Sequence, residues 1–136
     1  MAGYSGKPLV TKLGIKPFFN IFIINAPPDY KSIVHDIPES VIILTAWKKN
    51  INLVHIFSID KSEMIKSINK AKNHITQNGM IWVSWPKKSS KLLTDITEDT
   101  IRNIALSIDL VDIKVCAIDD CWSGLKLVIR KEKRIL

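Results

Sequence analysis

Three features of the sequence predict a three-layer α/β domain with a mostly parallel sheet of about six strands, closed by an antiparallel C-terminal hairpin. Continuous apolar runs such as NIFII and INLVHIF suit strands buried on both faces. Amphipathic helical segments alternate with these runs, the order that gives parallel strands and right-handed crossovers. The last two apolar segments are separated only by a short turn. We expect a single domain over residues 1–136, with residues 1–16 as an N-terminal arm and short helix.

The expected elements follow one another without a linker or repeat. Strands are expected at NIFII, which is ended by Asn25 and two prolines, and at SVIILTAW, INLVHIFSID and MIWVSW. Helices are expected at residues 8–13, 30–34, 60–79 and 97–108, and hairpin strands at residues 111–118 and 125–132. The helix over 60–79 has the clearest pattern, because Met64, Ile68 and Ile75 recur at helical spacing between Asp60 and an Asn-Gly stop signal. The gap between the second and third strands is too short for a full helix.

Composition narrows the class of protein but leaves its partners open. The net charge of +7 permits attraction to nucleic acid or acidic surfaces. The same charge follows from the Ile-, Asn- and Lys-rich composition of an AT-biased genome. No apolar run approaches a membrane span, and the first residues lack a signal-peptide pattern, so we expect a cytoplasmic protein with no membrane partner. Cys116 and Cys121 are spaced poorly for zinc and are expected to be free thiols, and no metal is expected.

Several segments resemble known families. LVHIF resembles a strand of class I S-adenosylmethionine-dependent methyltransferases, and ITQNGMIWVSW is similar to their helix, glycine turn and next strand. This resemblance implies a Rossmann-like fold. A narrower resemblance covers nearly the whole chain. MAGYSGKPLVTKLGIKP, NAPPDY, MIWVSWPKKSSKLLTDITED and VDIKVCAIDDCWSGLKLV resemble the signatures of a small bacterial family of domains of unknown function. This second resemblance implies no particular activity.

The methyltransferase resemblance fails at the positions that would hold the cofactor. Those enzymes place a Gly-rich turn after the first strand, where glycine lets the backbone approach the ligand. Here the turn reads Asn25-Ala26-Pro27-Pro28, and proline removes backbone donors. Nor does a carboxylate follow the second strand, where Leu44-Thr45-Ala46-Trp47 stands. We therefore expect no cofactor, disfavour S-adenosylmethionine and assign no catalytic residue.

The predicted ligand site lies at the carboxyl ends of the strands, where open α/β sheets bind their ligands. Its candidate residues are Asn25, Ala26, Pro27, Ser58, Trp85, Pro86, Lys87 and Lys88. Trp85 would supply a stacking face and the lysines an anionic contact. The alternative is that Trp85 caps the core and the lysines are solvated.

Four further residues are secondary candidates: Tyr4, Asp95, Trp122 and Ser123. Each has a structural alternative. Tyr4 would form a lid or belong to a frayed terminus, and Asp95 would meet Lys87 or a ligand, or cap a helix. Trp122 and Ser123 would bind substrate or fix the hairpin. His55 lies within an apolar strand and is expected to be a hydrogen-bonded core histidine rather than a base.

Three functions remain open from the sequence. The first is a non-catalytic, methyltransferase-like domain that binds a small anionic or nucleotide-like ligand. The second is a macromolecular binding module for nucleic acid or an acidic protein, and the third is a methyltransferase. The basic residues of the second hypothesis are Lys87, Lys88, Lys91, Lys126, Arg130, Lys131, Lys133 and Arg134.

Overall fold

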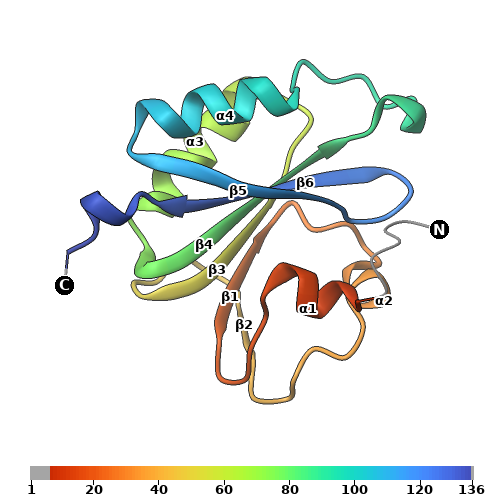
Figure 1. The fold of residues 1–136 in the computed structure, drawn as a ribbon. Coiled ribbons are helices and arrows are strands. Elements are labelled where there is room, and N and C mark those ends of the chain that lie inside the picture. The colour runs from red at the N-terminus through yellow and green to blue at the C-terminus, as the bar shows by residue number, and fades with distance from the viewer. Residues whose placement is uncertain (1–6, 136) are drawn as a thin grey trace.

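Six strands within residues 7–135, the part of the chain that this computed structural model describes, form one sheet with helices on both faces (Figure 1). The strands are β1 (Asn20–Ile24), β2 (Ile42–Leu44), β3 (Ile51–Phe57), β4 (Ile75–Pro86), β5 (Leu110–Ala117) and β6 (Trp122–Ile129). The helices are α1 (Leu9–Leu13), α2 (Tyr30–Ile33), α3 (Lys61–Lys72) and α4 (Glu98–Ser107), and two short 3-10 helices span Lys88–Ser90 and Lys131–Lys133.

The sheet topology confirms the predicted fold class. The strand order is β2-β1-β3-β4-β6-β5, in which the first four are parallel and β6 pairs antiparallel with both β4 and β5. The chain leaves β1 toward one edge to form β2 and then passes to the other side of β1 to form β3. Right-handed crossovers place these two connections on opposite faces of the sheet. Such a reversal creates a crevice at the carboxyl ends of β1 and β3.

The connection from β2 to β3 is the shortest crossover, and it borders the candidate site described below. Because β2 and β3 are parallel, residues 45–50 must return from one end of the sheet to the other. Six residues in an extended conformation reach about 20 Å, just enough to pass β1. Trp47 in this segment packs on Phe22 of β1 with ring centroids 4.7 Å apart. The crossover itself therefore covers the β1 face that no helix occupies.

Two clusters of buried side chains fill the layers on either side of the sheet. On one face, Met64 of α3 and Ile101 of α4 pack against Val54 of β3 and its neighbours. On the other, Leu13 of α1 and Tyr30 of α2 pack against the opposite side of the same strands. Figure 1 shows this division, with α3 and α4 on one side of the sheet and α1 and α2 on the other. Within residues 7–135, none of the helices has both the length and the apolar character of a membrane span.

Three predicted boundaries are corrected by the structure. The helix predicted over residues 60–79 ends at Lys72, because Ile75 already pairs with Ile51 in the β3–β4 ladder. Residues 76–79 form an irregularity in that ladder instead of a last helical turn. Strand β2 covers only Ile42–Leu44, and β6 begins at Trp122, within the segment that was predicted as a connection.

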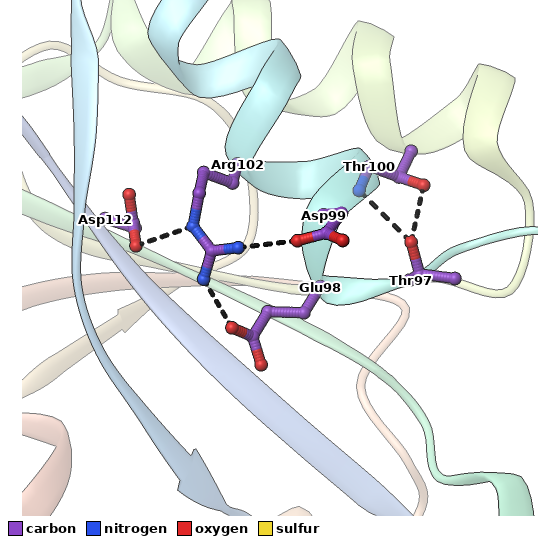
Figure 2. A network of polar contacts seen from close by, with 6 residues as sticks. All are labelled: Thr97, Glu98, Asp99, Thr100, Arg102 and Asp112. Atoms are coloured by element: carbon purple, nitrogen blue, oxygen red, sulfur yellow. Dashed lines mark hydrogen bonds and ion pairs between the residues drawn. The ribbon is translucent and has the colours of Figure 1, made fainter.

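Helix α4 is fixed at its first turn and to the neighbouring strand. Thr97 accepts a hydrogen bond from the backbone N–H of Thr100, which is the expected N-cap arrangement. Figure 2 shows that the Arg102 guanidinium reaches Glu98 and Asp99 on the same helix and Asp112 on β5. Its Nε lies 3.0 Å from Asp112 Oδ2. The arginine therefore joins α4 to β5, the strand at one edge of the sheet.

Candidate functional site

The loop after β1 brings the carboxyl ends of β1 and β3 together through one side chain. Asn25 has φ 55°, a left-handed conformation that asparagine tolerates better than most residues. Its Nδ2 donates to the carbonyl oxygen of Phe57 at 3.3 Å. The amide thus bridges the crevice between the two strands and leaves its own oxygen as an acceptor.

A groove of about 420 Å³ lies beside this loop, between β1, the β2–β3 crossover and α3. It is lined by Phe22, Ile23, Ile24, Asn25, Thr45, Trp47, Lys66, Ser67 and Lys70. Lys66 and Lys70 are exposed and lie one turn apart on the same helix face. Nζ of Lys70 is 5.3 Å from the Trp47 ring centroid, a cation–π distance. The groove therefore combines an aromatic ring, two ammonium groups and short polar side chains.

Ala26 and Pro27 line a different pocket from Asn25. They border a hollow of about 330 Å³ on the α2 side of the loop, together with Tyr30 and Lys31. Ile23 of β1 borders both spaces. The loop after β1 consequently separates two concave surfaces, and the predicted trio of residues 25–27 is divided between them.

Ser58 is placed at the carboxyl end of β3 as predicted, but its hydroxyl is engaged locally. The side chain is buried, and Oγ donates to the carbonyl oxygen of Asp60 at 3.0 Å. Its backbone N–H donates to Ser84 of β4. Ser58 thus shapes the turn into α3.

The predicted cluster at the end of β4 is spread over several environments. Trp85 is half-buried and packs on the cluster beneath α3 and α4. Pro86 is buried, and the backbone N–H of Lys87 donates to the carbonyl oxygen of Cys121 at 2.8 Å. Lys88 is exposed and begins a 3-10 helix. The lysines thus lie next to the β5–β6 turn, and ligand binding by this segment stays a prediction.

The secondary candidates have structural partners where the structure describes them. Asp95 accepts a hydrogen bond from the backbone N–H of Lys61 at 2.7 Å, so it caps α3 rather than the helix that follows it in sequence. Trp122 packs edge-on against Phe57, with centroids 5.2 Å apart. Ser123 pairs with Trp85 in the β4–β6 ladder. Tyr4 lies outside the described residues.

A fully buried polar network lies beneath the loop after β1. The Tyr30 hydroxyl is 2.9 Å from Nδ1 of His55, and Nε2 of His55 is 2.7 Å from Oγ of Ser84. Burial lowers the pKa of His55 to about 3 and raises the pKa of Tyr30 well above its usual value. A serine–histidine contact activates a nucleophile only where substrate reaches the hydroxyl, and here both side chains are fully buried. The network confirms the core-histidine prediction and ties α2 to β3 and β4.

The residues around the crevice do not fit S-adenosylmethionine in the manner that the fold implies. Pro27 and Pro28 have no N–H to offer a ligand, and Asn25 uses its amide to close the gap to β3. After β2 the chain presents Thr45 and Trp47 instead of a carboxylate. Among the residues that the structure describes, no group of three histidine, cysteine or acidic side chains is placed to hold a metal.

Sequence reasoning missed most of the groove. Of its lining residues only Asn25 was a candidate, whereas Thr45, Trp47, Lys66, Ser67 and Lys70 were not. The spacing of Lys66 and Lys70 on a predicted helix was a visible signal. Their proximity to Trp47 depends on the path of the crossover, which sequence pattern alone does not fix.

Comparisons with known proteins place the fold. No family model and no curated protein matches the chain, so the resemblance to the small bacterial family stays a prediction. Among solved structures, a SAM-dependent methyltransferase from Aquifex aeolicus is similar over 89% of this chain and 88% of its own, with 9% identity and a TM-score of 0.64. A putative type 11 methyltransferase from Sulfolobus solfataricus covers 100% of this chain and 98% of its own, with 12% identity and a TM-score of 0.61.

A third solved structure is also similar to this chain. The fibrillarin pre-rRNA processing protein from Methanococcus jannaschii matches 85% of this chain and 68% of its own, with 11% identity and a TM-score of 0.61. Sequence identities this low show a shared fold and not a shared activity. The sheet with its antiparallel C-terminal pair agrees with them. The chain therefore has the Rossmann-like fold of class I SAM-dependent methyltransferases.

Proposed function

We propose that this chain is a non-catalytic domain of the methyltransferase fold that binds a small anionic, nucleotide-like ligand in the groove beside Asn25. The observation that carries the proposal is the convergence of Trp47, Lys66 and Lys70 on one groove that runs along β1 from Phe22 to Asn25 at its carboxyl end. In open α/β sheets this end of the strands, at the reversal of strand order, is where ligands bind.

The chemistry of the lining suits a nucleotide. The two ammonium groups would pair with phosphate oxygens, and charge-assisted hydrogen bonds of this kind are the stronger ones. The Trp47 ring borders the groove and offers an aromatic surface to a base. Thr45, Ser67 and the free oxygen of Asn25 supply the short polar contacts that orient a ligand.

The absence of catalysis in this proposal rests on the loop after β1. Its two prolines and the missing carboxylate after β2 remove the contacts by which the fold holds a methyl donor. A second candidate, methyl transfer, is favoured by the fold shared with SAM-dependent enzymes. One of the similar structures, a magnesium protoporphyrin IX methyltransferase from Synechocystis, was solved with bound SAH.

Calorimetric titration with ADP, SAM and SAH tests both candidates. We expect ADP to bind, and the double variant Lys66→Gln/Lys70→Gln to bind it about tenfold more weakly, since the loss of two exposed charged contacts costs on the order of 1.4 kcal/mol in total. Lys114→Gln/Lys126→Gln, which removes the same charge from the other face, is the matched control.

The outcomes separate the candidates. Equal ADP affinity in Lys66→Gln/Lys70→Gln and wild type would remove the groove from consideration. Tight binding of SAM that is lost in the same variant would instead favour the enzyme.

A further inference from the structure

The outer half of one sheet face carries a concentration of positive charge. Helices α1 and α2 lie over the β1–β4 part of this face, and the β5–β6 pair extends beyond them (Figure 1). Two exposed or half-exposed lysines, Lys114 and Lys126, project from the pair on this face. Ile113, at the irregularity in the β5–β6 ladder, is about half exposed, and α4 packs on the opposite face of β5.

The sheet register brings four lysines to one place. Lys114 and Lys126 are directly opposite each other in the β5–β6 ladder, and Lys126 is opposite Trp82 in the β4–β6 ladder. Nζ of Lys114 lies 6.0 Å from the Trp82 ring centroid. The Trp82 indole N–H donates to the Leu13 carbonyl at 2.9 Å and so holds α1 against the same strand. Lys12 in the last turn of α1 and Lys16 just beyond the helix therefore lie close to the pair.

This arrangement is unfavourable in the free protein. Like charges that face each other across two strands are destabilising. Burial and then the neighbouring charges of Lys114 and Lys16 lower the pKa of Lys126. Within residues 7–135 none of the four lysines forms a salt bridge. An anion on this face would relieve the repulsion.

The shape of the surface favours an extended anion over a compact one. At the end of β6 the same face continues into a hollow of about 280 Å³ bordered by Arg130, Lys131, Glu132 and Arg134, in which Glu132 pairs with Arg130. Lys131 and Arg134 thus extend the positive side chains of Lys114 and Lys126 along the β5–β6 pair. Trp82 is fully buried beneath it and offers no stacking face to a base. Lysine binds phosphate as a point charge, which suits backbone contact without base reading.

We infer that the face carrying Lys12, Lys16, Lys114 and Lys126 binds the phosphate backbone of nucleic acid without sequence preference. Only Lys126 of this set was among the basic residues singled out from the sequence. The surface lies on the face opposite the ligand groove, so the inference does not depend on the proposed function.

Fluorescence anisotropy of a labelled duplex of about 20 base pairs, titrated at about 50 and 200 mM NaCl, tests the inference. Four phosphate contacts predict a log–log salt slope near −3.6, which is an affinity loss of about 150-fold over this range. Lys114→Gln/Lys126→Gln should halve the slope and reduce the loss to about 12-fold. Lys48→Gln/Lys49→Gln, at two exposed lysines of the β2–β3 crossover and with the same change in net charge, should keep the wild-type slope.

Three results would overturn the inference. The first is undetectable duplex binding at the lower salt concentration by folded protein. The second is an equal fall in slope in both double variants, which would reduce the effect to net charge. The third is displacement of the duplex by poly-glutamate as effectively as by unlabelled duplex of matched charge, which would assign the surface to an acidic protein.

Discussion

The Tyr30 hydroxyl lies 2.9 Å from Nδ1 of His55, and this contact joins the short helix after the ligand loop to the centre of the sheet. The other ring nitrogen contacts Ser84 Oγ, so the imidazole has a partner on both sides. A neutral imidazole donates from one nitrogen and accepts at the other. Protonation would disrupt this arrangement in a fully buried position.

Folding stability is therefore expected to fall with pH below neutrality. The folded-state pKa of His55, about 3, lies below the ordinary value of 6.5, so between these values the unfolded chain binds a proton that the folded chain does not. Stability is fully present above this window and is lost as pH falls, with a slope that approaches about 1.4 kcal/mol per pH unit. Urea unfolding at about pH 7, 6 and 5 measures the slope.

Two variants identify the source of that slope. His55→Gln should flatten the dependence between about pH 5 and 7. Tyr30→Phe keeps the imidazole and removes one partner, so it should lower stability at every pH and keep the slope. An unchanged slope in folded His55→Gln would rule out His55 as the titrating group.

The three carboxylates around Arg102 predict a salt-dependent link between α4 and β5. Arg102→Gln should lower the melting temperature at low ionic strength, because Glu98, Asp99 and Asp112 then repel one another. The difference from wild type should shrink as NaCl is added. Arg130→Gln removes a single ion pair, with Glu132, and should lower the melting temperature less than Arg102→Gln does. Equal melting temperatures of Arg102→Gln and wild type at low salt would contradict this role.

Gly124 marks a close approach between β6 and two side chains. A Cβ at this position would lie 2.9 Å from Cδ1 of Ile118 and 3.2 Å from Cε3 of Trp82. Gly124→Ala should therefore cost about 1–3 kcal/mol of unfolding free energy by overpacking. Ser123→Ala, on the opposite face of the same strand, is the control for urea unfolding. If both variants are equally stable, the contact is not tight.

The sequence pattern was sufficient for the architecture because each layer has its own period. Buried apolar runs and amphipathic helices lead directly to a mostly parallel sheet with helices on both faces. The pattern failed where a helix and a strand are both compatible with the same residues. Ile75 continues the helical face of Met64 and Ile68, yet it pairs with Ile51 as a strand residue. Pairing with a residue far along the chain decided the end of that helix.

The candidate site was less predictable because its parts meet only through the crossover. Trp47 reaches Phe22 and Lys70 because the segment before β3 folds back over β1, and its length alone does not show this path. The environment of Trp85 was more accessible to pattern analysis. Trp85 alternates with Ile81 and Val83, which are both buried, so strand periodicity places it against the buried cluster beneath α3 and α4.

Chemical-shift mapping of the labelled protein during titration with ADP tests the central claim most directly, because it locates the ligand without a mutation. The account predicts saturable shifts of the Asn25 side-chain amide, the Thr45 backbone amide and the Trp47 indole N–H. Shifts confined to Lys87 and Lys88 would contradict the groove and return the site to the end of β4. Shifts confined to the β5–β6 face would leave anion binding by Lys114 and Lys126 as the only activity supported.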